Sequence, residues 1–187
     1  MNPKLDSIRK QRGAVLIVSL IMLLVLTLLG FSAIQNTTLE ERMAGSLRSG
    51  QVAFEAAESA LRGGEAWIDQ FNTRPLPKTS GTAQEVVWVK DSPGNYNETN
   101  YWWQEADADW WSTYGQTYGN TLSIGGATDI SQGPRFLVEE LGLKKDTLVL
   151  GQSQDEIGQY YYQVTARGTG VNTNTVVKLR STYARRY

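Results

Sequence analysis

Residues 14–34 read AVLIVSLIMLLVLTLLGFSAI, and this almost wholly apolar stretch decides how the chain is organised. No charged side chain occurs from residue 13 to residue 39. At a rise of about 1.5 Å per residue, a helix of these 21 residues spans about 30 Å, which is the thickness of the hydrocarbon core of a bilayer. The stretch therefore predicts a membrane-spanning helix near the N-terminus.

The residues before this stretch are basic. They include a single acidic residue, Asp6, and four basic residues, Lys4, Arg9, Lys10 and Arg12. A basic flank stays in the cytoplasm, so we expect the rest of the chain to be exported. A cleaved secretory signal peptide is the alternative, but the apolar run is longer than the ~7–15 residues usual in such signals, and no small-x-small cleavage site precedes a turn.

The helix is expected to continue beyond the membrane to about residue 71. No proline occurs between Pro3 and Pro75 to interrupt it. From residue 43 to residue 68, apolar and small residues recur at steps of four and three, which is the spacing of one helix face. The charged residues of this segment fall off that face, which we expect to pack on a sheet. The residues expected to make this contact are Met43, Leu47, Phe54, Ala57, Leu61 and Ile68.

The rest of the chain predicts a sheet. Phe136 and Val138 alternate with Arg135, Leu137 and Glu139, which predicts a strand. Residues 159–167 and 176–183 predict an antiparallel hairpin with one side inward, whose turn contains residues 168–172. Weaker strand candidates occur within the polar, glycine-rich region before and between these strands, at residues 84–90, 122–124 and 147–150. The fold class is therefore α+β, a long N-terminal helix packed on a C-terminal antiparallel sheet.

Composition excludes several classes of function. The 187 residues include 18 Lys and Arg, 19 Asp and Glu, no His and no Cys. The formal net charge of −1 argues against nucleic-acid binding, which needs basic surface. Without His and Cys the chain lacks the commonest general base, the commonest metal ligand and all thiol chemistry. No spacing of the remaining reactive side chains singles out a catalytic group, so we expect no enzymatic activity, no metal and no cofactor.

Two segments carry a resemblance to a known family. Residues 13–45 (GAVLIVSLIMLLVLTLLGFSAIQNTTLEERMAG) and 51–62 (QVAFEAAESALR) closely resemble the PilX type of minor pilin of the type IV pilus assembly system. The C-terminal stretches PRFLVEEL, YYQVTARGTG and TVVKLRSTY are similar to that family too. The resemblance implies a pilin-like fold with a leader (1–13), a membrane and pilus-core half of the helix (14–38) and a periplasmic domain (39–187). Within that domain it implies a second half of the helix (39–71), a variable region (72–133) and the antiparallel sheet (134–187).

The resemblance also implies processing at the N-terminus. Prepilin peptidase would cut the bond between Gly13 and Ala14 on the cytoplasmic side of the inner membrane, and the freed Ala14 would be N-methylated. Pilins mostly begin with Phe or Met and carry Glu at the fifth mature position, where this chain has Val18. In the family, that Glu pairs with the terminal amine of the neighbouring subunit. The apolar residue at this position suits a subunit at the extreme tip of the filament.

The function implied is therefore that of a minor pilin that primes pilus assembly at or near the tip, with consequences for twitching motility and cell adhesion. The implied partners are other minor pilins, the major pilin, a PilY-type tip adhesin and prepilin peptidase. One alternative is a K-type pseudopilin at the tip of a type II secretion pseudopilus. Another is a membrane-tethered periplasmic binding module that never joins a filament.

Residues 96–118 concentrate aromatic side chains. These rings could fill a core in a region poor in Leu and Ile, form a contact surface for another minor pilin or a tip adhesin, or bind a glycan. The candidates for a partner surface are Trp102, Trp103, Trp110 and Trp111.

Three acidic residues in the same segment are spaced two apart. Glu105, Asp107 and Asp109 have the spacing of the first half of a calcium-binding loop. Trp110 stands where such a loop requires glycine. We therefore expect a solvated acidic turn and no metal.

Overall fold

A computed structural model describes residues 14–81, 86–93, 101–119, 130–146 and 158–187. The chain divides into two compact units, Met1–Ser46 and Leu47–Tyr187. The strand candidates at residues 122–124 and 147–150 lie outside the described residues, and so does Gly13.

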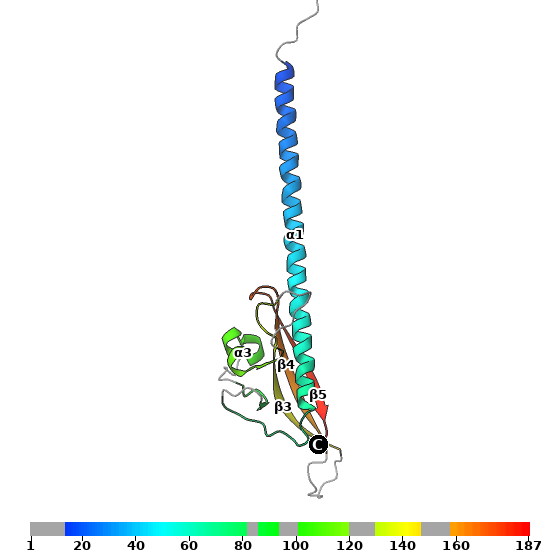
Figure 1. Cartoon of the computed structure of the whole chain (residues 1–187), viewed down its shortest axis with the longest axis vertical. Coiled ribbons are helices and arrows are strands. Elements are labelled where there is room, and N and C mark those ends of the chain that lie inside the picture. The colour runs from blue at the N-terminus through cyan, green and yellow to red at the C-terminus, as the bar shows by residue number, and fades with distance from the viewer. Residues whose placement is uncertain (1–13, 82–85, 94–100, 120–129, 147–157) are drawn as a thin grey trace, which may run out of the picture. The chain divides into compact units, whose positions relative to one another are not determined.

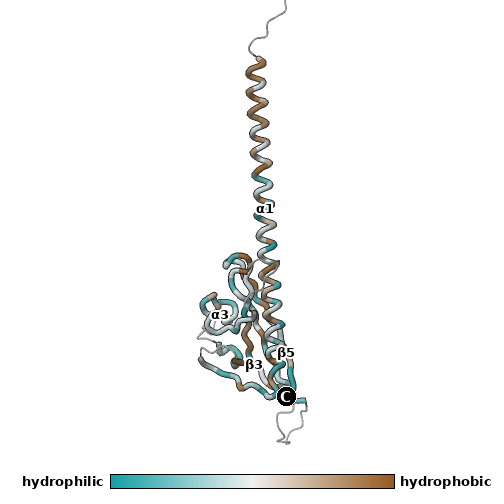
Figure 2. Tube along the Cα trace, in the orientation of Figure 1, coloured by the Kyte–Doolittle hydropathy of each residue, from teal (hydrophilic) through white to brown (hydrophobic). Residues whose placement is uncertain are grey.

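Helix α1 (Ala14–Ile68) begins in the first unit and ends in the second, three residues before the predicted end. Its N-terminal part is long and apolar enough to cross a membrane, judged by length and composition, and it carries the apolar colour along its length in Figure 2. The Ser19 hydroxyl donates a hydrogen bond to the Leu16 carbonyl at 2.9 Å, and the Thr27 hydroxyl donates to the Leu24 carbonyl at 2.8 Å. These polar side chains are thus satisfied within the helix, as a lipid environment requires.

The second unit contains a mixed sheet of five strands in the order β1–β3–β4–β5, with β2 also paired to β3 (Figure 1). The long strands β3, β4 and β5 run antiparallel, β2 is antiparallel to β3, and the short β1 pairs parallel to β3. The α+β pilin-like class is confirmed, while the predicted strand near residues 84–90 makes the sheet mixed. The strands are β1 (Val87–Val89), β2 (Gln116–Thr117), β3 (Arg135–Lys145), β4 (Gly158–Thr169) and β5 (Val176–Arg185).

The last turns of α1 pack closely on one face of this sheet. The contact is made by alanines that are completely buried, among them Ala53, Ala57 and Ala60. Gly168 of β4 lies directly under the helix, where an added Cβ would overlap the Ala53 carbonyl oxygen and the Ala57 amide nitrogen. Gly168 was expected in the hairpin turn. It belongs to β4 because only glycine lets the strand approach the helix backbone this closely.

The predicted helix face is wrong in its first half. Met43, Leu47 and Phe54 are exposed, with 65%, 73% and 49% of their surface accessible. The predicted residues in the last turns, Ala57, Leu61 and Ile68, are buried. In its first half, the predicted face was defined by the large apolar side chains of Met43, Leu47 and Phe54. The face that contacts the sheet consists mainly of smaller residues. The buried residues of α1 are Ser49, Val52, Ala53, Ala56, Ala57, Ala60, Leu61, Gly64 and Ile68.

The sheet buries both of its faces. Phe136 and Val138 face α1 together with the inward side of β4, as the alternation predicts. Leu137 and Glu139, which alternate with them along β3, are also buried, at only 2% and 1% exposed. Two short helices, α2 (Trp102–Glu105) and α3 (Ala108–Tyr114), account for this, because α3 and its neighbours cover the face opposite α1 (Figure 1).

Two glycines of α1 test this packing, because one faces the sheet and the other faces open space. A Cβ at Gly64 would lie 2.6 Å from Val164 Cγ1 and 2.9 Å from Phe136 Cδ2, whereas a Cβ at Gly50 meets nothing within 4 Å. We expect Gly64→Ala to lower the free energy of unfolding by about 1–3 kcal/mol through overpacking. Gly50→Ala should raise it by up to about 1 kcal/mol through helix propensity. Chemical unfolding followed by circular dichroism measures both, and Gly64→Ala proving as stable as Gly50→Ala would contradict the packing.

Candidate functional site

The aromatic segment forms a second core, on the face of the sheet opposite α1. Trp102 and Trp111 are 2% and 0% exposed and pack with Trp88, Ala106 and Leu137. The partly buried Trp103 and Trp110 pack against the same cluster, and the rings of Trp102 and Trp110 stack with centroids 4.9 Å apart. The prediction of a partner surface is therefore wrong for Trp102 and Trp111, because these side chains are enclosed.

The acidic residues of the segment have a structural role in starting α3. Asp107 is the residue before the first turn, and its Oδ1 accepts a hydrogen bond from the Trp110 amide at 2.8 Å. A side-chain acceptor at this position satisfies one of the free amides of the first turn. Within the part of the chain that the structure describes, no group of three or more acidic side chains is placed to hold a metal ion.

Positively charged side chains of the sheet donate hydrogen bonds to backbone carbonyls at the C-terminal ends of α2 and α3. Lys178 Nζ of β5 donates to the carbonyl oxygens of Gln104 and Ala106, at 3.2 and 3.0 Å, where α2 ends. Arg135 Nη1 of β3 donates to the Gly115 carbonyl at 3.0 Å, where α3 ends. Burial lowers the pKa of Lys178 and of Arg135. Because the last carbonyls of a helix have no partner within it, these contacts hold the aromatic layer on the sheet.

Glu139 is the buried charge at the centre of this face. Its Oε1 accepts hydrogen bonds from Trp102 Nε1 and from the Asp91 amide, both at 2.9 Å. Its Oε2 lies 3.5 Å from Arg180 Nη2, and the Arg180 guanidinium lies 4.9 Å from the centroid of the Trp103 ring. Burial raises the pKa of Glu139, and its hydrogen bonds and Arg180 oppose that rise. One carboxylate thus joins β3, β5, α2 and the turn after β1.

Sequence reasoning did not find Glu139. The available signal was a pair of acidic residues inside an apolar strand, in residues 136–141 (FLVEEL). The neighbouring Glu140 faces the other side of the sheet and accepts both hydrogen bonds of the Arg74 guanidinium, at 2.7 and 3.1 Å.

The end of α1 is tied to β5 by polar contacts. Ser181 Oγ donates to Glu65 Oε1 at 2.7 Å, and the Tyr183 hydroxyl donates to the Asp69 carboxylate at 2.7 Å. Arg185 Nη1 donates to the Ile68 carbonyl, the last of the helix. The two faces of the sheet therefore each carry a layer that is fixed by packing and by charged hydrogen bonds.

Of the residues predicted for processing and assembly, Ala14 and Val18 lie at the start of α1, and Gly13 lies outside the described residues. Ala14 is the first residue of the helix, and the first turn contains no acidic residue. The Val18 side chain is 55% exposed.

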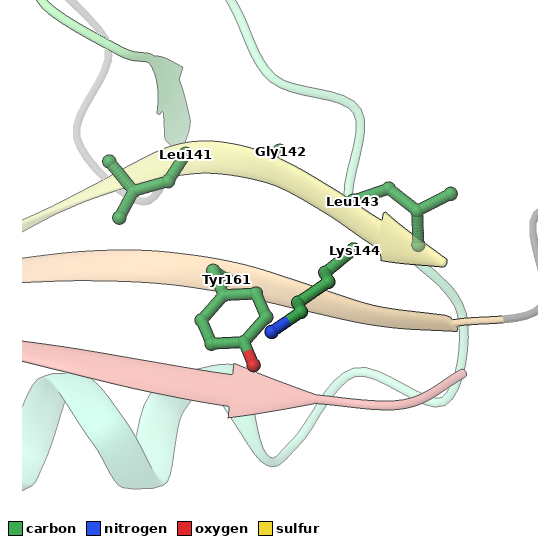
Figure 3. A pocket seen from close by; sticks show the side chains of 5 residues that line it. All are labelled: Leu141, Gly142, Leu143, Lys144 and Tyr161. Atoms are coloured by element: carbon green, nitrogen blue, oxygen red, sulfur yellow. The ribbon is translucent and has the colours of Figure 1, made fainter. Parts of the chain in front are cut away.

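A shallow hollow lies beside an irregularity of β3. The pairing with β4 shifts between Glu140 and Gly142, and Gly142 has a φ of 126°, which favours glycine. Figure 3 shows the Lys144 and Tyr161 side chains next to each other at this place. The hollow is lined by Leu141, Gly142, Leu143, Lys144 and Tyr161.

The burial of Glu139 makes a prediction about pH. Because its pKa is raised above the ordinary value of 4.5, the folded chain keeps a proton that the unfolded chain has released. The stability that this proton contributes is fully present below about pH 4.5 and is lost as the pH rises through the raised pKa. Glu139→Gln keeps an acceptor for both N–H groups but cannot ionise, so it should remove this part of the pH dependence. Glu139→Ala should be destabilising by about 1–3 kcal/mol, because it leaves the Trp102 N–H buried without a partner.

Urea unfolding across the acidic to neutral range measures the effect. Glu55→Gln is the matched control for the chemical change, because it makes the same substitution at an exposed position of α1. Identical pH profiles for the parent and Glu139→Gln would show that the carboxylate does not titrate differently in the folded state.

Comparison with protein-family models identifies the chain. A model described as PilX N-terminal matches residues 12–62, and a model described as Type IV pilus assembly protein PilX C-term matches residues 66–185. No curated protein and no solved structure matches the chain. The two models together cover α1 apart from residues 63–65, and they cover all five described strands. The chain therefore belongs to the PilX family of structural type IV pilus components, as a minor pilin that takes part in pilus assembly and associates with other pilus components.

Proposed function

We propose that this minor pilin primes pilus assembly and occupies the tip of the filament, and Val18 is the observation that carries the proposal. A shaft subunit of the family uses a carboxylate at this position to meet the terminal amine of its neighbour. The first turn of α1 has no acidic residue, so this chain cannot make that pair. A subunit with no predecessor loses nothing, and it avoids burying an unpaired charge in an apolar helix bundle, which costs several kcal/mol.

The proposed mechanism transfers α1 from the membrane to the filament. The basic leader holds the N-terminus in the cytoplasm and leaves the C-terminal domain in the periplasm, while α1 is stored in the bacterial inner membrane. After cleavage between Gly13 and Ala14, α1 leaves the bilayer and joins a bundle of similar helices. The apolar side chains of its N-terminal part, which are exposed within the described residues, support this step because they remain out of water in both places.

The proposed partners are other minor pilins, the major pilin and a PilY-type tip adhesin. Exposed apolar side chains on α1 in the second unit support contacts with other subunits. Leu47 and Phe54 are exposed within the described residues, with 73% and 49% of their surface accessible. Exposed apolar groups on one side of a helix are suited to packing against another helix. The Trp-rich layer supports recognition through its outer surface, where Tyr101 is 60% exposed.

Processing by prepilin peptidase gives the first prediction from this proposal. N-terminal sequencing of the membrane-extracted protein should return Ala14 as the first residue. Gly13→Val should block cleavage, because the added side chain crowds the bond to be cut, while Val15→Ala should be processed normally. Recovery of Met1 from cells with an active peptidase would favour a membrane-tethered binding module that never joins a filament.

Position in the filament gives the second prediction. Labelled filaments should carry a few copies of this chain, clustered at one end, because Val18 cannot support a repeating shaft contact. Val18→Glu should be tolerated or mildly harmful, without turning the protein into a shaft subunit. Copies spaced along the whole filament at high stoichiometry would refute the tip position, and copies found only in a type II secretion pseudopilus would favour the pseudopilin alternative.

A further inference from the structure

A second hollow lies in the Leu47–Tyr187 unit, between the last turns of α1 and strand β2. It has a volume of about 420 Å³, within the range of about 300–1,000 Å³ found for small-molecule sites. It opens on the α1 side of the sheet and is separate from the Trp-rich core. Its floor is the buried Phe136, and its walls carry Trp67, Gln70, Gln116, Thr117 and Tyr118.

Two aromatic rings are held in place around this hollow. The Tyr118 ring lies against the backbone of α1 at Gly63, where an added Cβ would overlap it. The Tyr118 amide donates to the Pro134 carbonyl at 2.9 Å, which fixes the backbone beneath the ring. Trp67 contacts Phe71 edge-on, with centroids 4.8 Å apart, and lies 6.2 Å from the Phe136 ring. Tyr118 nevertheless remains 39% exposed, so its ring is positioned without being buried.

Three polar side chains surround the rings, those of Gln70, Gln116 and Thr117. Within the described residues, these three side chains make no hydrogen bond. Each of these groups can both donate and accept. Arg62 is the one charged residue among those that line the hollow, and its guanidinium pairs with Glu58 at 2.9 Å. The hollow therefore offers hydrogen bonds without net charge.

We propose that this hollow binds a neutral saccharide of one or two pyranose rings. The apolar C–H face of a pyranose packs on the electron-rich face of an aromatic ring, which Trp67 and Tyr118 supply. Each sugar hydroxyl donates and accepts at once, which matches the carboxamides of Gln70 and Gln116 and the hydroxyl of Thr117. The site is independent of the position of the subunit in the filament, so it can be tested separately from the proposed function.

A proline-rich peptide is the other class of ligand that binds aromatic grooves. Such a peptide offers mainly carbonyl acceptors, because proline has no N–H, and would leave the acceptors of both carboxamides unused. The mixed donors and acceptors of this hollow therefore favour a saccharide.

The test uses the full chain in lipid nanodiscs prepared without glycoside detergents, whose sugar headgroups would compete. Maltose, lactose and chitobiose are the probes, with saturation-transfer NMR to detect contact and calorimetric titration to measure affinity. At least one disaccharide should bind with a dissociation constant of about 1 mM or lower. Tyr118→Ala should weaken that binding about tenfold or more, whereas Tyr101→Ala, which removes an exposed ring elsewhere, should leave it unchanged.

A second pair of variants separates binding from folding. Gln70→Leu keeps the size of an exposed side chain but removes its hydrogen-bond donor and acceptor groups, and it should also weaken binding about tenfold. Gln104→Leu is the matched control on the opposite layer, and melting temperatures verify that all variants fold. No binding of any probe at about 10 mM would overturn the proposal. Binding unaffected by both Tyr118→Ala and Gln70→Leu would overturn it too, as would binding of a proline-rich peptide with no disaccharide bound.

Discussion

The close contact between α1 and β4 is the constraint on which the rest of the globular unit depends. Backbone meets backbone where Ala53 and Ala57 lie over Gly168, and no side chain larger than a methyl group fits between them. The larger side chain of Phe54, next to Ala53, remains 49% exposed. Towards the end of α1, Tyr160, Tyr162 and Val164 of β4 fill the core between the helix and the sheet.

Much of the fold could be predicted from the sequence, because its strongest signals are local. The uncharged stretch of α1, the absence of proline and the alternation in β4 and β5 depend only on neighbouring residues. The packed face of α1 could not be predicted in the same way. A periodicity count gives the same weight to Leu47, which is exposed, as to Ile68, which is buried. The two differ in their contact with the sheet, and the spacing of residues within the helix does not reveal that contact.

The Trp-rich layer on the face opposite α1 shows more clearly that contacts between distant segments cannot be predicted from local sequence. Four tryptophans within ten residues indicate an aromatic cluster, but whether it is a core or a surface depends on a strand that comes later in the chain. Glu139 meets Trp102 across 37 positions of sequence, and Lys178 meets the end of α2 across 72. Such contacts follow from the strand order, in which β3 lies at the centre between β1, β2 and β4, and composition does not reveal that order.

Because the two faces of the sheet are covered by different layers, the two layers differ in how far their sequences can change during evolution. The face toward α1 is fixed by small residues that tolerate almost no change, whereas the opposite face is covered by a layer built from residues 101–114, which lie between α1 and β3 in the sequence. Three side chains of the sheet, Lys178, Arg135 and Glu139, hold that layer through backbone carbonyls and one indole. Substitutions on the outer surface of that layer therefore leave the contact between α1 and β4 unchanged. The residues exposed on the layer can change during evolution while the packing that fits the helix to a filament is kept, although both belong to one small domain.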